Sequence, residues 1–314
     1  MRKWDYKGIL PAVQIPYRED YSLDEPEFRR FIDWLLSHEG ITGIVTNGHT
    51  GEVFALSMKE RAEVTRVAAS QAKGRVPVVS GICCEGINEA VEHGHAFVEA
   101  GAAGALVMPP HMWLRFGMTP QHVVDYFAAI GEQTKLDLIV HIYPAWTRAS
   151  YSTETLLELA KLPWVKAFKI GTREMSKYAR DVTALRKAAP DKALLTCHDE
   201  YLLASMVQGV DGALVGFGSF IPDKITALFR AVKNNQLNEA MQLQLEINPL
   251  KEAVYGLGEP TGDAHARMKT AMMLAGRFKS DRVRAPIQPP KGAELEQIIT
   301  ALDNAGMLIK QAAE

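Results

Sequence analysis

The chain has 314 residues, of which 47% are hydrophobic and 23% are charged, and its 35 basic side chains nearly balance 37 acidic ones. This composition excludes a disordered protein, and a formal net charge of -2 excludes a general nucleic-acid binder, which needs a basic surface. The sequence has no apolar run of the roughly 18 residues that cross a membrane, no apolar signal-peptide stretch, and too few cysteines for a disulfide scaffold. We therefore expect a globular cytoplasmic protein with neither a membrane nor a nucleic-acid partner.

Eight short apolar runs end in Gly, Pro or small polar residues, and each is followed by a helical stretch. Their starts lie 28 to 35 residues apart, with one shorter step before the last, which is the length of a βα unit. Eight such units predict a (β/α)8 TIM barrel, an α/β fold. The predicted strands are residues 8–13, 43–47, 76–81, 104–108, 136–142, 165–169, 193–197 and 212–216.

The first two helical stretches begin with capping patterns. Ser22, followed three residues later by Glu25, is expected to cap the first helix, and Ser57 with Glu60 repeats the pattern before the second. A doubly wound nucleotide-binding sheet is the structural alternative. Residues 8–16 lack the Gly-x-Gly-x-x-Gly turn of such a sheet, which favours the barrel.

The strand pattern stops after about residue 228. Helices are predicted beyond it, over residues 234–257, 263–275 and 292–312. We therefore expect a barrel over residues 1–230 and a C-terminal helical extension over residues 231–314 that does not function independently.

Lys169 is the strongest candidate catalytic residue. It ends the predicted sixth strand, and the catalytic groups of a barrel lie at the C-terminal ends of its strands. Alternation places Val165, Ala167 and Lys169 on one face of the sixth strand, and the first two are small and apolar. If that face points inward, desolvation lowers the pKa of the Lys169 ammonium and leaves neutral amine that can attack a ketone. A lysine that extends from the strand end to solvent is the alternative.

The polar loop over residues 48–52, called here the Thr50 loop, is the second candidate. It follows the second strand, so its backbone N–H groups and the Thr50 hydroxyl can hold a carboxylate, unless the loop only turns the chain. Four histidines also fall at predicted strand ends. With Asp199 and Glu52 they leave open a divalent-metal site, although their spacings form no metal signature. These histidines are His49, His111, His141 and His198.

In this order, the motifs resemble the dihydrodipicolinate synthase and N-acetylneuraminate lyase family. The resemblance covers nearly the whole chain and is carried by the Thr50 loop, Pro144, Lys169 and the segments 8–16 and 283–289. It implies a class I lyase in which Lys169 forms an imine with a 2-oxo acid such as pyruvate, without a cofactor or metal. It also implies that Thr50 and Gly51 receive the carboxylate. Homo-oligomers, dimers or tetramers, are usual in the resembled family.

The chain departs from the family pattern at the residue that moves protons. The resemblance places a catalytic tyrosine 28 residues before the lysine and three before the proline, and both counts give His141. Tyr143 takes this role only if the strand end is reshaped. Histidine keeps a proton donor and acceptor, but its ordinary pKa is about 6.5 instead of about 10.

Further departures affect the candidate substrate-binding residues. His49 replaces the first threonine of the family's Thr-Thr pair, and His111 stands at the second tyrosine of its proton relay. Trp146 stands at the arginine by which synthases bind their aldehyde's carboxylate, and Arg148 lies two residues further. Val215, at the end of the eighth strand, is the last of the candidate substrate-binding residues.

Loss of that arginine argues against a synthase of lysine biosynthesis. It favours a retro-aldolase or hydratase-aldolase whose aldehyde is bulky, with Lys169 and either His141 or Tyr143 as catalytic residues. A dehydratase or deaminase acting on a 2-keto-3-deoxy acid shares the imine and is an alternative. A non-catalytic 2-oxo acid sensor and a metal-dependent barrel enzyme are further alternatives.

Overall fold

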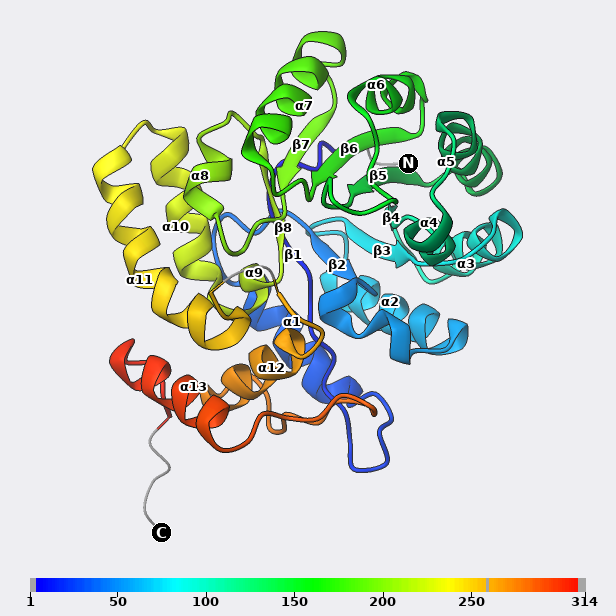
Figure 1. Ribbon diagram of the computed structural model, residues 1–314. Coiled ribbons are helices and arrows are strands. Elements are labelled where there is room, and N and C mark those ends of the chain that lie inside the picture. The colour runs from blue at the N-terminus through cyan, green and yellow to red at the C-terminus, as the bar shows by residue number, and fades with distance from the viewer. Residues whose placement is uncertain (1–3, 258–259, 310–314) are drawn as a thin grey trace.

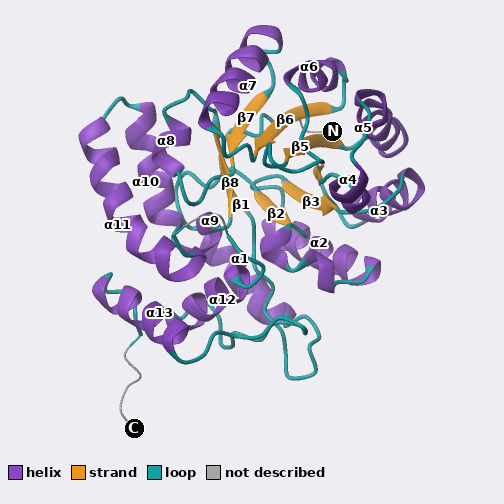
Figure 2. Cartoon of the chain, viewed as in Figure 1, coloured by secondary structure: helices purple, strands orange, loops and turns teal. Residues whose placement is uncertain are grey.

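The computed structural model describes residues 4–257 and 260–309. Its eight parallel strands form one sheet in the order β1-β8-β7-β6-β5-β4-β3-β2, and parallel bridges from Ile9 to Ile41 and from Ala12 to Val45 join its two ends. The chain is therefore a (β/α)8 TIM barrel, as predicted, with helices around the strands (Figures 1 and 2). The strands are β1 (Gly8–Pro11), β2 (Ile44–Thr46), β3 (Val78–Ile82), β4 (Gly104–Val107), β5 (Asp137–Ile142), β6 (Val165–Ile170), β7 (Ala193–Thr196) and β8 (Gly212–Val215).

Helices follow the strands in chain order, and short ones occupy several loops at the C-terminal ends of the strands. The helices up to the end of the eighth βα unit are α1 (Glu25–Leu36), α2 (Met58–Ala72), α3 (Ile87–Glu99), α4 (His111–Phe116), α5 (Pro120–Thr134), α6 (Thr153–Lys161), α7 (Met175–Ala188), α8 (Leu202–Met206), α9 (Phe217–Phe220) and α10 (Pro222–Lys233). Two 3-10 turns, η1 (His49–Gly51) and η2 (Val53–Ala55), form much of the segment between β2 and α2.

Strand alternation divides the buried apolar residues into two layers. Side chains such as Leu10 and Ala167 fill the inside of the barrel, whereas Ile9 and Phe168 pack between strands and helices. Val165 was expected inside but packs in the outer layer. The reason is a register shift, because Val165 pairs with Leu138 while Ala167 pairs with the next residue, Ile139. Lys169, two residues beyond Ala167, is left on the inward face.

One of the two predicted helix caps is confirmed and the other is wrong. Ser57 and Glu60 form a complete capping box at α2. Helix α1 is capped by Asp24 instead of Ser22, since the Asp24 carboxylate accepts a hydrogen bond from the Glu27 N–H at 3.2 Å. Ser22 instead lies in the preceding turn, where its hydroxyl donates to Asp20.

Beyond α10, the described residues fold into the helices α11 (Leu237–Tyr255), α12 (Ala264–Leu274) and α13 (Ala293–Asn304). Helix α11 packs against α10, and α12 and α13 pack against α11 on the same side of the barrel (Figure 1). The last helix is shorter than predicted, because the chain leaves the helix just before Gly306, whose φ is +65°. Residues 310–312 of that predicted helix lie outside the described residues.

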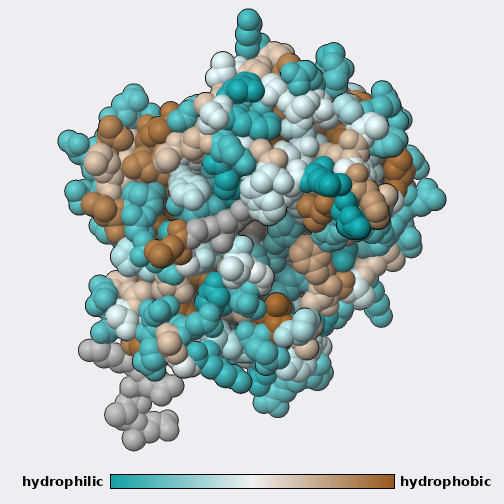
Figure 3. All heavy atoms as spheres, in the orientation of Figure 1, coloured by the Kyte–Doolittle hydropathy of each residue, from teal (hydrophilic) through white to brown (hydrophobic). Residues whose placement is uncertain are grey.

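Hydrophilic residues are spread over the face in Figure 3, with smaller hydrophobic groups among them. Within the described residues, no helix is both long and apolar enough to cross a membrane.

Candidate active site

A cavity of about 700 Å³ opens at the C-terminal ends of the strands. Most of the predicted site residues line it, namely His49, Thr50, His111, His141, Tyr143, Trp146, Lys169 and Val215. Gly51 lies behind Thr50, where an added Cβ would stand 2.9 Å from the Val13 carbonyl oxygen. Arg148 is not among the lining residues: it is exposed and its guanidinium donates to the Arg115 carbonyl at 3.4 Å. His198 is fully buried outside the lining, against the ring of Tyr178.

Lys169 extends from the inward face of β6 into the cavity, beside His141 of β5, its partner in the strand register. Removal from bulk water lowers the pKa of the Lys169 ammonium, the Cys197 thiol and Asp199 carboxylate oppose this shift, and Arg173 adds to it. The effect of burial on the Lys169 pKa therefore exceeds that of the neighbouring acids. A larger fraction of the amine is neutral at a given pH than in an exposed lysine. This is the protonation behaviour that a Schiff-base nucleophile requires.

Three rings, those of His49, His141 and Tyr143, line the same cavity as Lys169 and contact one another. The Tyr143 hydroxyl lies 3.0 Å from Nε2 of His49, and the centres of the His141 and Tyr143 rings are 5.0 Å apart. Burial, followed by the charge of Lys169, lowers the pKa of His49 to about 3 and that of His141 well below its usual value. Burial raises the pKa of the Tyr143 phenol. All three rings are thus neutral near pH 7, and the phenol can exchange its proton with His49.

The Thr50 loop is fixed from the C-terminal extension. Glu52 has a left-handed backbone (φ +54°) and its carboxylate forms an ion pair with Lys269 of α12, which is fully buried. The Arg284 N–H donates to the other Glu52 oxygen at 3.1 Å. The Lys269 ammonium also donates to the Arg282 carbonyl at 3.0 Å. The extension therefore supports the loop that carries His49 and Thr50.

Several cavity residues were not among the predicted catalytic and substrate-binding residues, and Asp199 was considered only as a ligand of the alternative metal site. Arg173 lies four residues beyond Lys169, and its Nε donates to the buried Glu200 carboxylate at 2.8 Å. Asp199 accepts hydrogen bonds from the N–H groups of Gly216 and Phe217 at 3.1 and 3.0 Å, yet burial raises its pKa to about 7. The extension adds two further lining residues, Tyr255 and His265. Arg173 and Asp199 follow strand ends and were within reach of the rule that selected Lys169, whereas nothing in the sequence pointed to His265.

The strand-end metal site that the sequence left open as an alternative is not formed by the described residues. The one group of three potential ligands among them is Cys84, Glu89 and His93, which includes none of the four strand-end histidines.

The comparison with known families agrees with this geometry. A model of the dihydrodipicolinate synthetase family matches residues 5–305. The chain belongs to this family. Its members include Schiff-base lyases that act on pyruvate through a lysine, and the chain is accordingly a lyase.

Relatives of this family match along nearly their whole length. The 4-hydroxy-tetrahydrodipicolinate synthase of Anaplasma marginale (strain Florida) is 28% identical over 307 residues, which cover 98% of this chain and 97% of that protein. Among solved structures, N-acetylneuraminate lyase from Fusobacterium nucleatum is 26% identical with a TM-score of 0.82, covering 96% of this chain and 99% of that one. A prophage protein of the same family from E. coli K12, solved in complex with pyruvate, has a TM-score of 0.87 at 24% identity, covering 96% and 99% of the two chains.

The buried ion pair beneath the Thr50 loop leads to a prediction for this family member. Replacing Lys269 by methionine is expected to lower the free energy of unfolding by about 3–5 kcal/mol, because the Glu52 carboxylate loses its buried partner. Urea unfolding followed by circular dichroism measures this loss. The double variant Lys269→Met with Glu52→Gln also removes the unpaired negative charge of Glu52 and should recover part of the stability. A double variant that is no more stable than Lys269→Met would contradict this explanation.

Buried neutral histidines give a second prediction, on acid stability. Burial, followed by the charge of Arg173, lowers the pKa of His198 to about 3, so near pH 5 the unfolded chain binds a proton that the folded chain does not. Stability contributed by His198 is therefore lost as the pH falls from its unfolded pKa of about 6.5 towards 3, and amounts to about 2 kcal/mol by pH 5. The lowered pKa of His141 also decreases the free energy of unfolding on acidification. The raised pKa of Asp199 increases it and partly offsets the effect of the two histidines.

Urea unfolding near pH 7.5 and pH 5 tests the sign. The free energy of unfolding should be lower at the acidic pH, and His198→Asn should reduce the difference between the two conditions. A free energy of unfolding that is constant or rises on acidification would contradict the prediction.

Proposed function

We propose that the chain is a pyruvate-type Schiff-base lyase that performs retro-aldol or hydratase-aldolase chemistry with a bulky aldehyde. The observation that carries the proposal is Lys169 in the cavity with a lowered pKa, flanked by the hydrogen-bonded pair of Tyr143 and His49. The neutral amine of Lys169 attacks C2 of the 2-oxo acid, the carbonyl oxygen leaves as water, and an imine forms. The imine then accepts the electron pair of the carbon–carbon bond that is broken.

The carboxylate of the 2-oxo acid is assigned to the Thr50 loop. Thr50 is buried at the cavity wall, and the short helical turn η1 presents backbone N–H groups there. The ion pair between Glu52 and Lys269 keeps this loop in place. Val215 lines the same cavity from the end of β8.

Proton transfer at the substrate hydroxyl is assigned to Tyr143 and His49 acting together. The phenol can give its proton to the leaving or arriving oxygen and recover it from the imidazole at 3.0 Å. His141 packs beside both rings and beside Lys169, where as a neutral group it adds no positive charge next to the amine.

A bulky or aromatic aldehyde is favoured by the outer part of the cavity. Phe54, Leu114 and Trp146 line it, and Trp146 is 69% exposed in the free chain. Apolar walls of this kind bind apolar groups by removing their surface from water. The charge of Arg173, further inside, is balanced by Glu200 at 2.8 Å, so a carboxylate-bearing aldehyde is not required to neutralise it.

Borohydride trapping tests the proposal. The protein is incubated with pyruvate, reduced, digested and analysed by mass spectrometry, and a reduced pyruvate adduct is expected at Lys169. Aldol formation is then measured as pyruvate consumption with a panel of small, carboxylated and aromatic aldehydes, and aromatic members should react fastest. An unmodified Lys169 overturns the imine, and preference for a small carboxylated aldehyde overturns the substrate class. An adduct without turnover would instead indicate a 2-oxo acid sensor.

A dehydratase acting on a 2-keto-3-deoxy acid is the second candidate function. Asp199 favours it, because this cavity carboxyl has a pKa of about 7 and lies near Lys169, whose pKa it affects. Dehydration releases a hydroxyl that needs a proton, and such a carboxyl can supply one. Loss of 2-keto-3-deoxy acid without release of an aldehyde would distinguish this function from aldol cleavage.

We further propose a cytoplasmic homo-oligomer, a dimer or a tetramer. Exposed apolar side chains near the cavity, Met112, Phe116 and Trp146, are the surface that we expect a second copy to cover. Light scattering during gel filtration measures the assembly, and a monomer at micromolar concentration would contradict it.

A further inference from the structure

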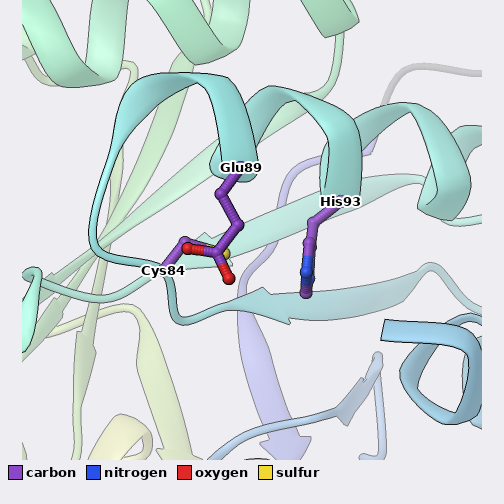
Figure 4. Close-up of side chains that lie close together, drawn as sticks. All are labelled: Cys84, Glu89 and His93. Carbon is purple, nitrogen blue, oxygen red and sulfur yellow. The ribbon is translucent and has the colours of Figure 1, made fainter. Parts of the chain in front are cut away.

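A second cluster of reactive side chains lies outside the cavity, beside α3. Cys84 precedes this helix, and Glu89 and His93 belong to it; Figure 4 shows Glu89 and His93 directed from the helix towards the segment that carries Cys84. A thiol sulfur, a carboxylate oxygen and an imidazole nitrogen lie within 4.8 Å of one another. We propose that Cys84, Glu89 and His93 bind one divalent metal ion of the zinc class.

The local sequence explains why these groups meet. Glu89 and His93 are four residues apart on a helix, so their side chains share one face. Cys84 lies two residues beyond the end of β3, where the chain turns back towards that face. Cys84 and His93 are both only 4% exposed, whereas Glu89 is exposed, so solvent can reach the site from the carboxylate side.

One feature of His93 independently points to a ligand. Its Nδ1 is buried and has no hydrogen-bond partner among the described residues, although buried imidazole nitrogens are normally paired. An imidazole nitrogen without a hydrogen-bond partner can offer its lone pair to a cation. This buried imidazole, together with the thiol and the carboxylate, forms a set of donors that can bind a cation.

The donor set selects the class of ion. Sulfur, nitrogen and oxygen donors together suit Zn²⁺, and three protein ligands leave a fourth position for water. The Cys84 thiol loses its proton to solvent as the ion binds, because the thiolate is the form that ligates a metal. The thiolate and the Glu89 carboxylate then supply two negative charges, which exceed the single positive charge of Arg61, the residue that donates to the Cys83 carbonyl at 3.1 Å.

The ion would act as a clamp on the segment that precedes α3. In this segment Glu85 accepts hydrogen bonds from the backbone N–H groups of His111 and Met112 at 3.0 and 2.8 Å, and its own N–H donates to Glu89 at 3.2 Å. The Cys83 sulfur lies 3.9 Å from Nε2 of His111. An ion bound to Cys84 and Glu89 would therefore also hold the cavity wall that contains His111. It would take no part in the chemistry of Lys169.

Metal titration of the full chain tests the site. Chelator-treated protein is titrated with Zn²⁺ and separately with Co²⁺, whose thiolate charge-transfer absorption reports on sulfur coordination. We expect one ion per chain, the charge-transfer band, and a Tm that rises on adding Zn²⁺. Cys84→Ser should abolish the band. Glu89→Gln, an exposed change that spares the fold, should weaken Zn²⁺ binding by about tenfold or more.

Two matched variants control for adventitious binding. Cys83→Ser changes the adjacent thiol, and His95→Gln changes an exposed histidine of the same helix; both should keep the stoichiometry and the band. Lys169→Met should bind Zn²⁺ like the wild type, which separates this site from the proposed catalysis. The proposal is overturned if the wild type retains no Zn²⁺, or if Cys84→Ser and Glu89→Gln bind it as tightly as the wild type.

Discussion

Replacing Lys169 by methionine is expected to abolish the borohydride-trapped pyruvate adduct and to lower kcat/KM for aldol cleavage by on the order of 10³-fold or more. Methionine keeps most of the side-chain length and suits the apolar inward face of β6 that Ala167 begins, so the barrel should remain folded. Intact-protein mass spectrometry after reduction measures the adduct, and a coupled assay of released pyruvate measures the rate.

Lys166 provides the matched control, because it lies on the same strand and donates to the Pro163 carbonyl at 2.6 Å, away from the cavity lining. Lys166→Met should leave both the adduct and the rate close to wild type. A pyruvate adduct that persists in Lys169→Met would assign the imine to another amine and remove the basis of the proposed function.

The barrel could be predicted because its signal is local and repeated. Each βα unit needs an apolar strand, a turn and an amphipathic helix, and eight of them follow one another at similar spacings apart from a shorter last step. The errors occurred where one tertiary detail overrides the local pattern. Val165 moved to the outer layer because of the register shift opposite Leu138, and Asp24 displaced Ser22 as a cap.

The candidate site was only partly predictable, and residues 141–148 show why. Counting from Lys169 predicted His141 at the position of a tyrosine. That count treated His141 and Tyr143 as alternatives, of which only one faces the substrate. Strand alternation puts residues two apart on one face, and both side chains line the cavity. Beyond Pro144 the chain turns, with the Thr147 N–H donating to the Pro144 carbonyl at 3.0 Å, so alternation no longer applies. Trp146 consequently lines the cavity while Arg148 points elsewhere.

Residues from the C-terminal extension were beyond the reach of strand-based rules. Lys269 and His265 belong to α12, about 100 residues after Lys169, and they meet the barrel only through helix packing. A buried lysine in a helix has no sequence signature that separates it from an exposed one. The support of the Thr50 loop by Lys269 therefore emerges only from tertiary structure.

Replacing Tyr143 by phenylalanine is the second large effect that we expect. The change removes the hydroxyl that lies 3.0 Å from Nε2 of His49, and should lower kcat about 10²- to 10⁴-fold, the usual contribution of a positioned proton donor. The pyruvate adduct at Lys169 should still be trapped, because the amine is untouched. Single-turnover kinetics with the preferred aldehyde separate the two steps.

A double-mutant cycle then identifies the group that moves the proton. If Tyr143 and His49 act as a unit, Tyr143→Phe combined with His49→Gln loses little more activity than Tyr143→Phe alone. His141→Gln, which changes the neighbouring ring 5.0 Å from Tyr143, should cost less than Tyr143→Phe. The opposite order, with a mild Tyr143→Phe and a severe His141→Gln, would assign proton transfer to His141. In that case His141 would perform the step for which the sequence comparison with the family pattern predicted it.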